Sequence, residues 1–114
     1  MVYLDETRLG ELPDEECVAY DEAIRASGHC TASEALESVR IATTVRIRNG
    51  KLGITDGPFS ESKEQLAGFY MIEASDLNEA IRLASGIPAA RVGSIEVRPI
   101  RPIRQVVARA RTEQ

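Results

Sequence analysis

The sequence predicts an α+β fold in which two helices cover one face of an antiparallel sheet. Three observations favour this class: two amphipathic helical patterns separated by strand-like segments, an Asn-Gly hairpin signal at 49–50, and an apolar segment at 68–74. The 114 residues suffice for one domain with its own core and are too few for two. We therefore expect one compact unit over 1–102, followed by a basic tail over 103–114.

The first strand and the first helix follow from local signals. Residues 2–4 are apolar and strand-like, and charged residues end this short segment. Residues 13–27 carry helix signals, because Pro13 and three acids suit a helix start and Gly28 suits a left-handed end. The stripe expected to face the sheet comprises Cys17, Tyr20, Ala23 and Ile24.

The middle of the chain is predicted to be mostly strand. Residues 30–36 favour a short strand, and residues 43–48 and 51–55 favour a hairpin around Asn-Gly. Residues 60–65 resemble one helical turn. Residues 68–74 are apolar on both faces, so we expect a central strand with a helix on one side and a second subunit on the other.

The second helix and the last strand complete the plan. Asp76 and Glu79 form a capping box, and Gly86 ends the helix. Residues 94–98 form the last strand. This order favours a split βαβ, ferredoxin-like arrangement with both helices on one face. The helical stripe expected to be buried comprises Leu77, Ala80, Ile81 and Ala84.

Charge is distributed unevenly along the chain. Residues 1–37 carry a net charge of -8, residues 38–90 carry 0, and residues 91–114 carry +4, which sum to the total of -4. An acidic body lacks the broad basic face that duplex DNA requires, so we expect no direct nucleic-acid partner. The arginines of the tail have three interpretations: they contact an acidic partner, they contact the acidic first helix of a second subunit, or they are solvated.

Composition argues against a membrane or secreted location and against a metal or nucleotide cofactor. No apolar run is long enough to cross a membrane, and the first ten residues lack a secretory signal, so we expect a cytoplasmic protein without a membrane partner. One histidine and two cysteines argue against a metal site. The sequence has no Gly-rich nucleotide motif, and we expect no cofactor.

Asp56 and His29 are the leading candidates for chemistry. Asp56 ends a strand beside Gly57 and Pro58, where loops commonly present functional groups, but an Asp there also fixes a turn through backbone amides. His29 follows a helix end, and its imidazole is a candidate base or proton shuttle. Its alternative role is a helix-end histidine stabilised by the dipole.

Glu64 is the second carboxylate of the candidate catalytic set, because Asp56 and Glu64 would form an acid/base pair if the loop folds back. The alternative is that Lys63 and Glu64 are solvated surface charges. Glu34, Lys63 and Tyr70 are candidate ligand-binding residues, although Tyr70 also suits core or dimer packing.

A long segment carries a family resemblance. Residues 54–70, which read ITDGPFSESKEQLAGFY, closely resemble the signature of the DGPF group of YCII-related (YciI-like) proteins. Further matches in order include 76–80 and 87–100, so that the resemblance covers about 1–102. It implies a ferredoxin-like fold that dimerises through its sheets into an α/β barrel, in bacterial proteins often encoded beside extracytoplasmic-function sigma factors.

Two departures limit what the resemblance implies. Relatives usually begin several residues earlier with a full first strand, so we expect either a misassigned start or a truncated strand at 2–4. In the YciI branch a proposed catalytic dyad pairs a histidine in the first helix with an aspartate before a proline; here that helix has no histidine and Ile87 precedes Pro88.

Two functions therefore remain open. The first is a small-molecule-binding protein or an acid/base enzyme of isomerase or lyase type, with a site near the DGPF loop. The second is a non-catalytic accessory or regulatory protein with a sigma-factor-linked partner. A homodimer is expected in either case, because the strand at 68–74 offers apolar residues to two faces.

Overall fold

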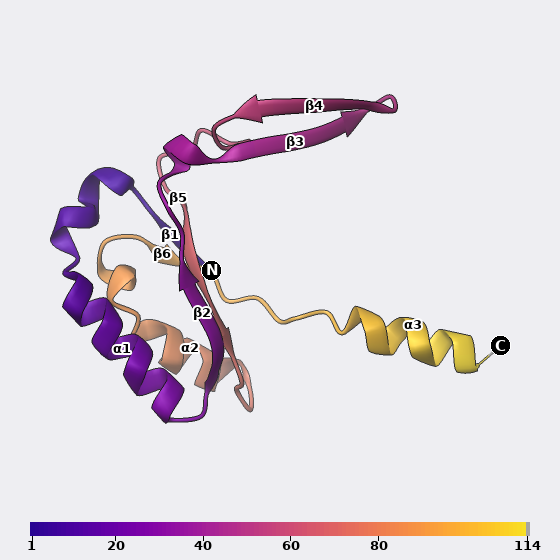
Figure 1. Ribbon diagram of the computed structural model, residues 1–114. Coiled ribbons are helices and arrows are strands. Elements are labelled where there is room, and N and C mark those ends of the chain that lie inside the picture. The colour runs from indigo at the N-terminus through magenta and orange to yellow at the C-terminus, as the bar shows by residue number, and fades with distance from the viewer. Residues whose placement is uncertain (114) are drawn as a thin grey trace.

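The computed structural model describes residues 1–113 (Figure 1). A four-stranded antiparallel sheet has the order β2-β5-β1-β6, and a separate two-stranded sheet pairs β3 with β4. The strands are β1 Val2–Leu4, β2 Cys30–Ala35, β3 Thr43–Arg48, β4 Lys51–Asp56, β5 Gln65–Ile72 and β6 Ser94–Ile95. The α-helices are α1 Asp14–Ala26, α2 Leu77–Ser85 and α3 Ile103–Thr112, and the 3-10 helices are η1 Glu6–Glu11, η2 Val39–Ile41 and η3 Pro88–Arg91.

The molecule divides into a body and two arms. The body is the four-stranded sheet with α1, α2 and η3, and both α-helices lie on one face of this sheet (Figure 1). The hairpin arm is β3 and β4, and the C-terminal arm is residues 96–112. Both arms extend away from the body on the side opposite α1 and α2 (Figure 1).

The strand order of the body is compatible with the predicted ferredoxin-like arrangement. β5 is central, as its apolar sequence predicted, and it pairs with both β2 and β1. The short β1 is also central, between β5 and β6. Its three residues therefore contribute to the core, and Val2 and Leu4 are buried.

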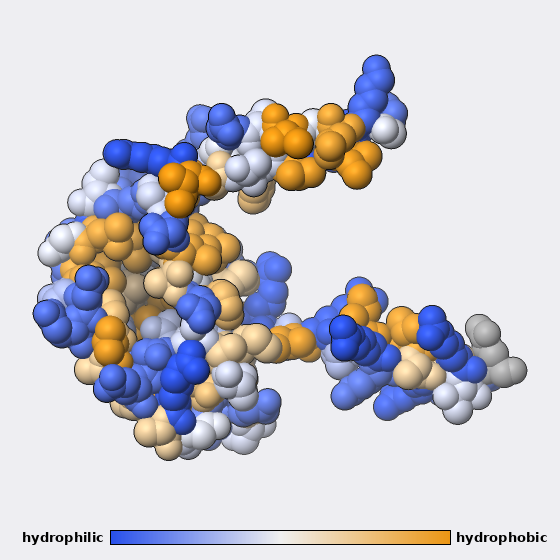
Figure 2. Space-filling model, viewed as in Figure 1, coloured by the Kyte–Doolittle hydropathy of each residue, from blue (hydrophilic) through white to orange (hydrophobic). Residues whose placement is uncertain are grey.

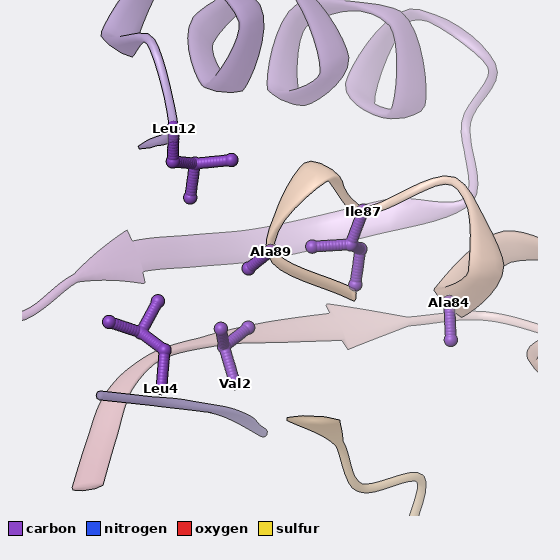
Figure 3. Close-up of a cluster of buried hydrophobic side chains, with 6 residues drawn as sticks. All are labelled: Val2, Leu4, Leu12, Ala84, Ile87 and Ala89. Carbon is purple, nitrogen blue, oxygen red and sulfur yellow. The ribbon is translucent and has the colours of Figure 1, made fainter. Parts of the chain in front are cut away.

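The core lies between the sheet and the helices. Its larger cluster of buried side chains comprises Val2, Leu4, Leu12, Ala84, Ile87 and Ala89 (Figure 3). A second cluster comprises Ile24, Cys30 and Leu83. The chain packs closely here: a Cβ on Gly93 would overlap the carbonyl oxygen of Tyr3 in β1, so only glycine fits at that position.

Helix α1 agrees with its sequence signals, with one correction. It runs from Asp14 to Ala26, and Gly28 has φ +82° just after it, as the left-handed end predicted. Cys17, Tyr20 and Ile24 face the body. Ala23 was expected in the same stripe but is exposed, because it lies toward the edge of that stripe.

Helix α2 confirms the capping box and shifts the buried stripe. The Glu79 amide donates to Asp76 Oδ1 at 2.8 Å, and Glu79 Oε1 accepts from the Ser75 amide at 3.0 Å. The buried residues are Ala80, Leu83 and Ala84. Leu77 and Ile81 are 62% and 48% exposed, so the expected stripe was partly wrong. The helix turns Leu83 toward Cys30 and Ile24 instead.

The last strand is shorter than predicted, and the tail is partly helical. The expected strand at 94–98 ends at Ile95, after which the Glu96 amide donates to the Met1 carbonyl and residues 97–98 have no strand opposite them among residues 1–113. Residues 103–112, expected as a basic tail, form the helix α3. Its residues are exposed.

The hairpin arm confirms the Asn-Gly turn. Asn49 and Gly50 have φ of 54° and 73°, as a two-residue turn with positive φ requires. The register pairs Val45 with Ile54 and Ile47 with Leu52, so these four side chains share one face. All four are 60–66% exposed, and Figure 2 shows hydrophobic side chains gathered along this arm.

No α-helix within residues 1–113 is long and apolar enough to cross a membrane.

Candidate functional site

The DGPF loop, residues 56–59, begins at the base of the hairpin arm, where hydrogen bonds to its backbone hold Gly57 in place. The Gly57 amide donates to the Ala42 carbonyl at 2.7 Å, and the Thr44 hydroxyl donates to the Gly57 carbonyl at 2.8 Å. Gly57 has φ +92°, a left-handed conformation that favours glycine. The turn is therefore fixed by Thr44 and by glycine rather than by the Asp56 side chain.

The Asp56 carboxylate is exposed and forms no hydrogen bond or ion pair with any residue in 1–113. The turn-fixing alternative predicted from the sequence does not apply to its side chain. Phe59, in the same loop, is 77% exposed. A ring this exposed, three residues after an exposed carboxylate, was not predicted from the sequence, although the DGPF motif contains both residues.

Residues 60–64 form an irregular loop instead of the predicted helical turn. The Gln65 side-chain amide donates to the Ser60 carbonyl at 2.8 Å and to the Ser62 carbonyl at 2.7 Å. The Ser62 hydroxyl donates to the Glu64 carbonyl at 2.7 Å. These side-chain bonds offer the backbone an alternative to the helix, and β5 already begins at Gln65.

Glu64 lies in a charged group at the end of the sheet where β5 begins. Glu64 Oε1 accepts from the Ser94 hydroxyl at 2.8 Å. Arg8 donates to the Val92 carbonyl at 3.1 Å and pairs with Glu11 at 2.7 Å. A hydrogen bond from Thr7 lowers the pKa of Asp5, and the nearby charge of Lys63 lowers it further. All these charges are accessible to solvent, so water screens them.

His29 lies at the opposite end of the sheet. Its Nδ1 is 2.9 Å from the Glu73 carbonyl and 3.7 Å from Glu79 Oε1. β5 separates this end from Glu64, and its eight residues span about 26 Å at roughly 3.3 Å each. Within one chain, His29 and Glu64 therefore do not converge.

The strand register places Glu34 and Tyr70, two of the candidate ligand-binding residues, on different faces of the sheet. Glu34 pairs with Phe69, and Ser33 pairs with Tyr70. The ring of Tyr70 packs edge-on against Tyr20 of α1, with centroids 6.0 Å apart, so Tyr70 faces the helices. Glu34 and Phe69 consequently face the open side of the sheet.

Burial keeps the phenol of Tyr70 neutral. Burial is the main cause that raises its pKa to about 12, and the charge of Asp21 adds to it. Asp21 is held near the sheet because it accepts from the buried Ser33 hydroxyl, to which Arg25 also donates at 2.7 Å. This arrangement fixes α1 on β2 and keeps Tyr70 neutral.

The open side of the sheet is mostly apolar, but it carries Glu34 and also Ser94, which pairs with Tyr3 and donates to Glu64 Oε1. Tyr3 pairs with Leu66 on the same face as the pairs formed by β2 and β5. Leu66 and Met71 are 40% and 43% exposed. Glu34 is the carboxylate placed among these side chains. The residues placed on this face by the strand register comprise Tyr3, Ala32, Glu34, Leu66, Phe69, Met71 and Ser94.

Within residues 1–113, the best-formed depressions are not lined by these candidate residues. One shallow depression of about 250 Å³ lies between α2 and the start of the C-terminal arm, away from the DGPF loop, and Ile81, Ala84, Ile95 and Val97 line part of it. Within residues 1–113, no group of three or more His, Cys, Asp or Glu side chains is placed to hold a metal ion.

The comparisons with known proteins agree with the fold. The model of the YCII-related domain matches residues 6–104, which is most of the chain. An uncharacterized protein of Rhizobium meliloti (strain 1021) is 46% identical over 61 residues, or 52% of this chain and 49% of that relative. The match therefore spans about half the length of the curated relative. The chain belongs to the YCII-related family.

Proposed function

We propose that the chain works in the cytoplasm as a homodimer that holds a small-molecule ligand between the open sheet faces of its two copies. The observation that carries this proposal is the apolar open face, since α1 and α2 cover only the other side of the sheet. An apolar surface of this kind on a soluble domain marks a place of contact. A second copy that packs sheet against sheet covers this face and forms a chamber.

The arms support the same assembly. Both arms extend on the side of the open face, and the hairpin presents four side chains that are 60–66% exposed. An isolated two-stranded hairpin is marginally stable in water, so this one needs a partner surface. The exposed Phe59 and the DGPF loop at the base of the hairpin are then placed at the edge of the chamber.

Glu34 is the group that we propose for acid/base chemistry. It lies beside Phe69 on the open face, where a second copy would exclude water. Loss of water disfavours the charged form of a carboxylate, and a carboxylate in such a site is suited to proton transfer. The reaction class that fits is isomerisation or elimination. Asp56, Lys63 and Glu64 would bind the polar end of the ligand at the edge.

Native mass spectrometry of protein purified from its own host tests this proposal. We expect a dimer with a co-purified small molecule. Glu34→Gln is expected to lower occupancy about tenfold, because a charge-assisted contact is lost. Glu37→Gln is the matched control, since Glu37 is exposed and lies beyond the end of β2. Equal occupancy in both variants contradicts the role of Glu34.

The second candidate function is a non-catalytic regulatory protein with a sigma-factor-linked partner. The observation that favours it is that the hairpin and α3 both present apolar side chains to solvent. A different protein could cover these side chains as well as a second copy could. Co-purification of a stoichiometric second polypeptide in place of a second copy would favour this function over the first.

A further inference from the structure

The two faces of the hairpin arm differ in polarity. One face carries the four apolar side chains that are 60–66% exposed. The other face carries three cations, Arg46, Arg48 and Lys51, which suit contact with water. A two-stranded hairpin alone is marginally stable, so its apolar side needs a cover. The apolar hairpin face comprises Val45, Ile47, Leu52 and Ile54.

Helix α3 also has one apolar side. Its apolar residues recur at the spacing i, i+3, i+4 and i+7, which places them along one side of a helix. Ile103, Val106 and Val107 are 55%, 48% and 43% exposed. A helix of ten residues is marginal in water and is usually stabilised by packing its apolar side. The α3 stripe comprises Ile103, Val106, Val107 and Ala110.

The rest of the chain leaves both apolar surfaces open. Within residues 1–113, no hydrogen bond or ion pair joins α3 to the body or to the hairpin arm. Figure 2 shows hydrophobic side chains at the surface of both arms. Each arm therefore presents an apolar side that a second molecule is needed to cover.

The α3 stripe and the apolar hairpin face match in size. The stripe spans about 10.5 Å from its first to its last residue, at roughly 1.5 Å per residue. The two apolar pairs of the hairpin are two residues apart, which is about 6.6 Å at roughly 3.3 Å per residue. Two strands about 4.8 Å apart are narrower than a helix about 10 Å across. One helix therefore covers the apolar hairpin face.

The same hairpin face carries a negative charge at its base. Asp56 pairs with Thr43 in the strand register, which places both residues on the apolar hairpin face. The Asp56 carboxylate is exposed and forms no hydrogen bond or ion pair within residues 1–113. Arg104 borders the start of the α3 stripe and Arg111 borders its end. A helix laid along the hairpin in either direction therefore brings an arginine toward Asp56.

We propose that α3 of one copy packs on the apolar hairpin face of a second copy. This inference rests on the proposed homodimer. The C-terminal arm follows β6 and the hairpin arm follows β2, and these strands are the two opposite edges of the sheet. When two sheets face each other about a two-fold axis parallel to their strands, opposite edges meet. Each C-terminal arm then lies beside the hairpin of the other copy, and the contact is made twice.

The reach of the C-terminal arm allows this contact. Both arms extend on the open side of the sheet (Figure 1), so the hairpin of the second copy points back toward the first copy. Facing sheets pack about 10 Å apart, and the base of the second hairpin starts at the level of the second sheet. Residues 96–102 reach up to about 23 Å at roughly 3.3 Å each. The helix α3 therefore reaches that hairpin without passing around the second body.

Cysteine cross-linking identifies the hairpin that α3 contacts. Cys17→Ala and Cys30→Ala first remove the native thiols of the full chain. One such chain then carries Ile54→Cys, a second carries Val107→Cys, and the mixture is treated with a short bismaleimide. We expect a cross-linked species of twice the chain mass in the mixture and none above background in either variant alone.

A control variant and a double variant complete this experiment. Arg46→Cys mixed with Val107→Cys is the matched control, because Arg46 lies on the other face of the hairpin. A chain that carries both Ile54→Cys and Val107→Cys is expected to give covalent dimers. A cross-link that forms only within that chain, at the mass of one copy, places α3 on its own hairpin and overturns the proposal. Equal cross-linking from Arg46→Cys and Ile54→Cys overturns it as well.

The dimer dissociation constant provides a second measurement. Val107→Asp places a charge in the α3 stripe, and packing on the hairpin would remove water from that charge. We expect sedimentation velocity to show a dimer that is weaker by about tenfold or more. Gln105→Asp is the matched control, because it adds the same charge on the outer side of α3. Equal dissociation constants for the two variants contradict the proposal.

These outcomes are distinct from failure of the proposed function. A dimer that forms without a cross-link between α3 and a hairpin overturns the α3 contact and leaves the sheet-to-sheet assembly intact. A wild-type chain that is monomeric at every concentration overturns both.

Discussion

The body and the hairpin arm both contain strands with apolar side chains, but these side chains are buried in the body and exposed in the hairpin arm. In the body, Val2 and Leu4 are 6% and 3% exposed beneath the helices, whereas Val45 and Leu52 of the hairpin are 60% and 63% exposed. Both segments are strands with alternating apolar residues. Alternation of apolar residues therefore predicts an apolar face of a strand and does not say which surface will cover that face. In the body that surface belongs to the same chain.

The largest expected effect compares one substitution in the two regions. Leu4→Ala removes a buried side chain and is expected to lower the free energy of unfolding by about 2–5 kcal/mol. Leu52→Ala changes an exposed side chain and is expected to cost less than about 1 kcal/mol in dilute monomer. Urea unfolding at low concentration measures both. Equal losses would mean that the hairpin is already covered within its own chain.

The second prediction concerns the close packing of the body. Gly93→Ala places a Cβ against the carbonyl of Tyr3 and the side chain of Leu4, and the backbone must shift. We expect a loss of about 1–3 kcal/mol in unfolding free energy. Gly10→Ala is the control, because nothing lies within 4 Å of a Cβ at that position. A neutral Gly93→Ala would contradict this packing of η3 on β1.

A smaller effect tests the start of α2. Asp76→Ala removes the side chain that accepts from the Glu79 amide at 2.8 Å, and we expect a loss of about 1 kcal/mol. Asn78→Ala, in the same first turn, should change stability by less than about 0.5 kcal/mol. Thermal unfolding of the two variants measures the difference. Similar melting temperatures would show that the cap contributes nothing in solution.

At neutral pH the smallest effect is that of Tyr70, and it grows only at high pH. The pKa of Tyr70 is raised from 10.0 to about 12 in the folded chain, so its contribution is complete below pH 10 and is lost as the pH rises toward 12. Tyr70→Phe removes this titration. We expect stability near the wild type at pH 7 and a shallower decline between pH 10 and 12, which denaturant unfolding across this range measures. An unchanged decline would mean that other groups cause it.

Local signals predicted the elements that local residues determine. Asn49 and Gly50 fix the hairpin through positive φ, and Asp76 fixes the start of α2 through its own side chain. The turn expected at 60–65 was wrong because Gln65 binds the carbonyls of Ser60 and Ser62 and starts a strand. Neither these side-chain hydrogen bonds nor the start of β5 can be predicted from a short window of sequence.

The candidate residues were found more easily than their arrangement. Asp56 was identified at a strand end and is indeed an exposed carboxylate at the base of the hairpin. The face on which Glu34 and Tyr70 lie depends on irregularities in the register, one between Cys30 and Ala32 and one between Val2 and Tyr3. A shift of one residue exchanges the two faces, and the sequence alone does not locate it.

The distance between His29 and Glu64 has a similar origin. Each residue directly precedes a strand, and the sequence places each at an element boundary without saying at which end of the sheet. The antiparallel pairing of β2 with β5 puts the start of β2 beside the end of β5. His29 is thus next to Glu73, and Glu64 is a full strand length away.

The central claim is that a second copy covers the open sheet face and the hairpin. Sedimentation velocity of the full chain over micromolar concentrations tests it most directly. We expect a species of twice the 12.5 kDa chain mass, and substitution of Met71 by Lys on the open face should dissociate it while the chain stays folded. A wild-type chain that sediments with the mass of one copy at every concentration would contradict the account.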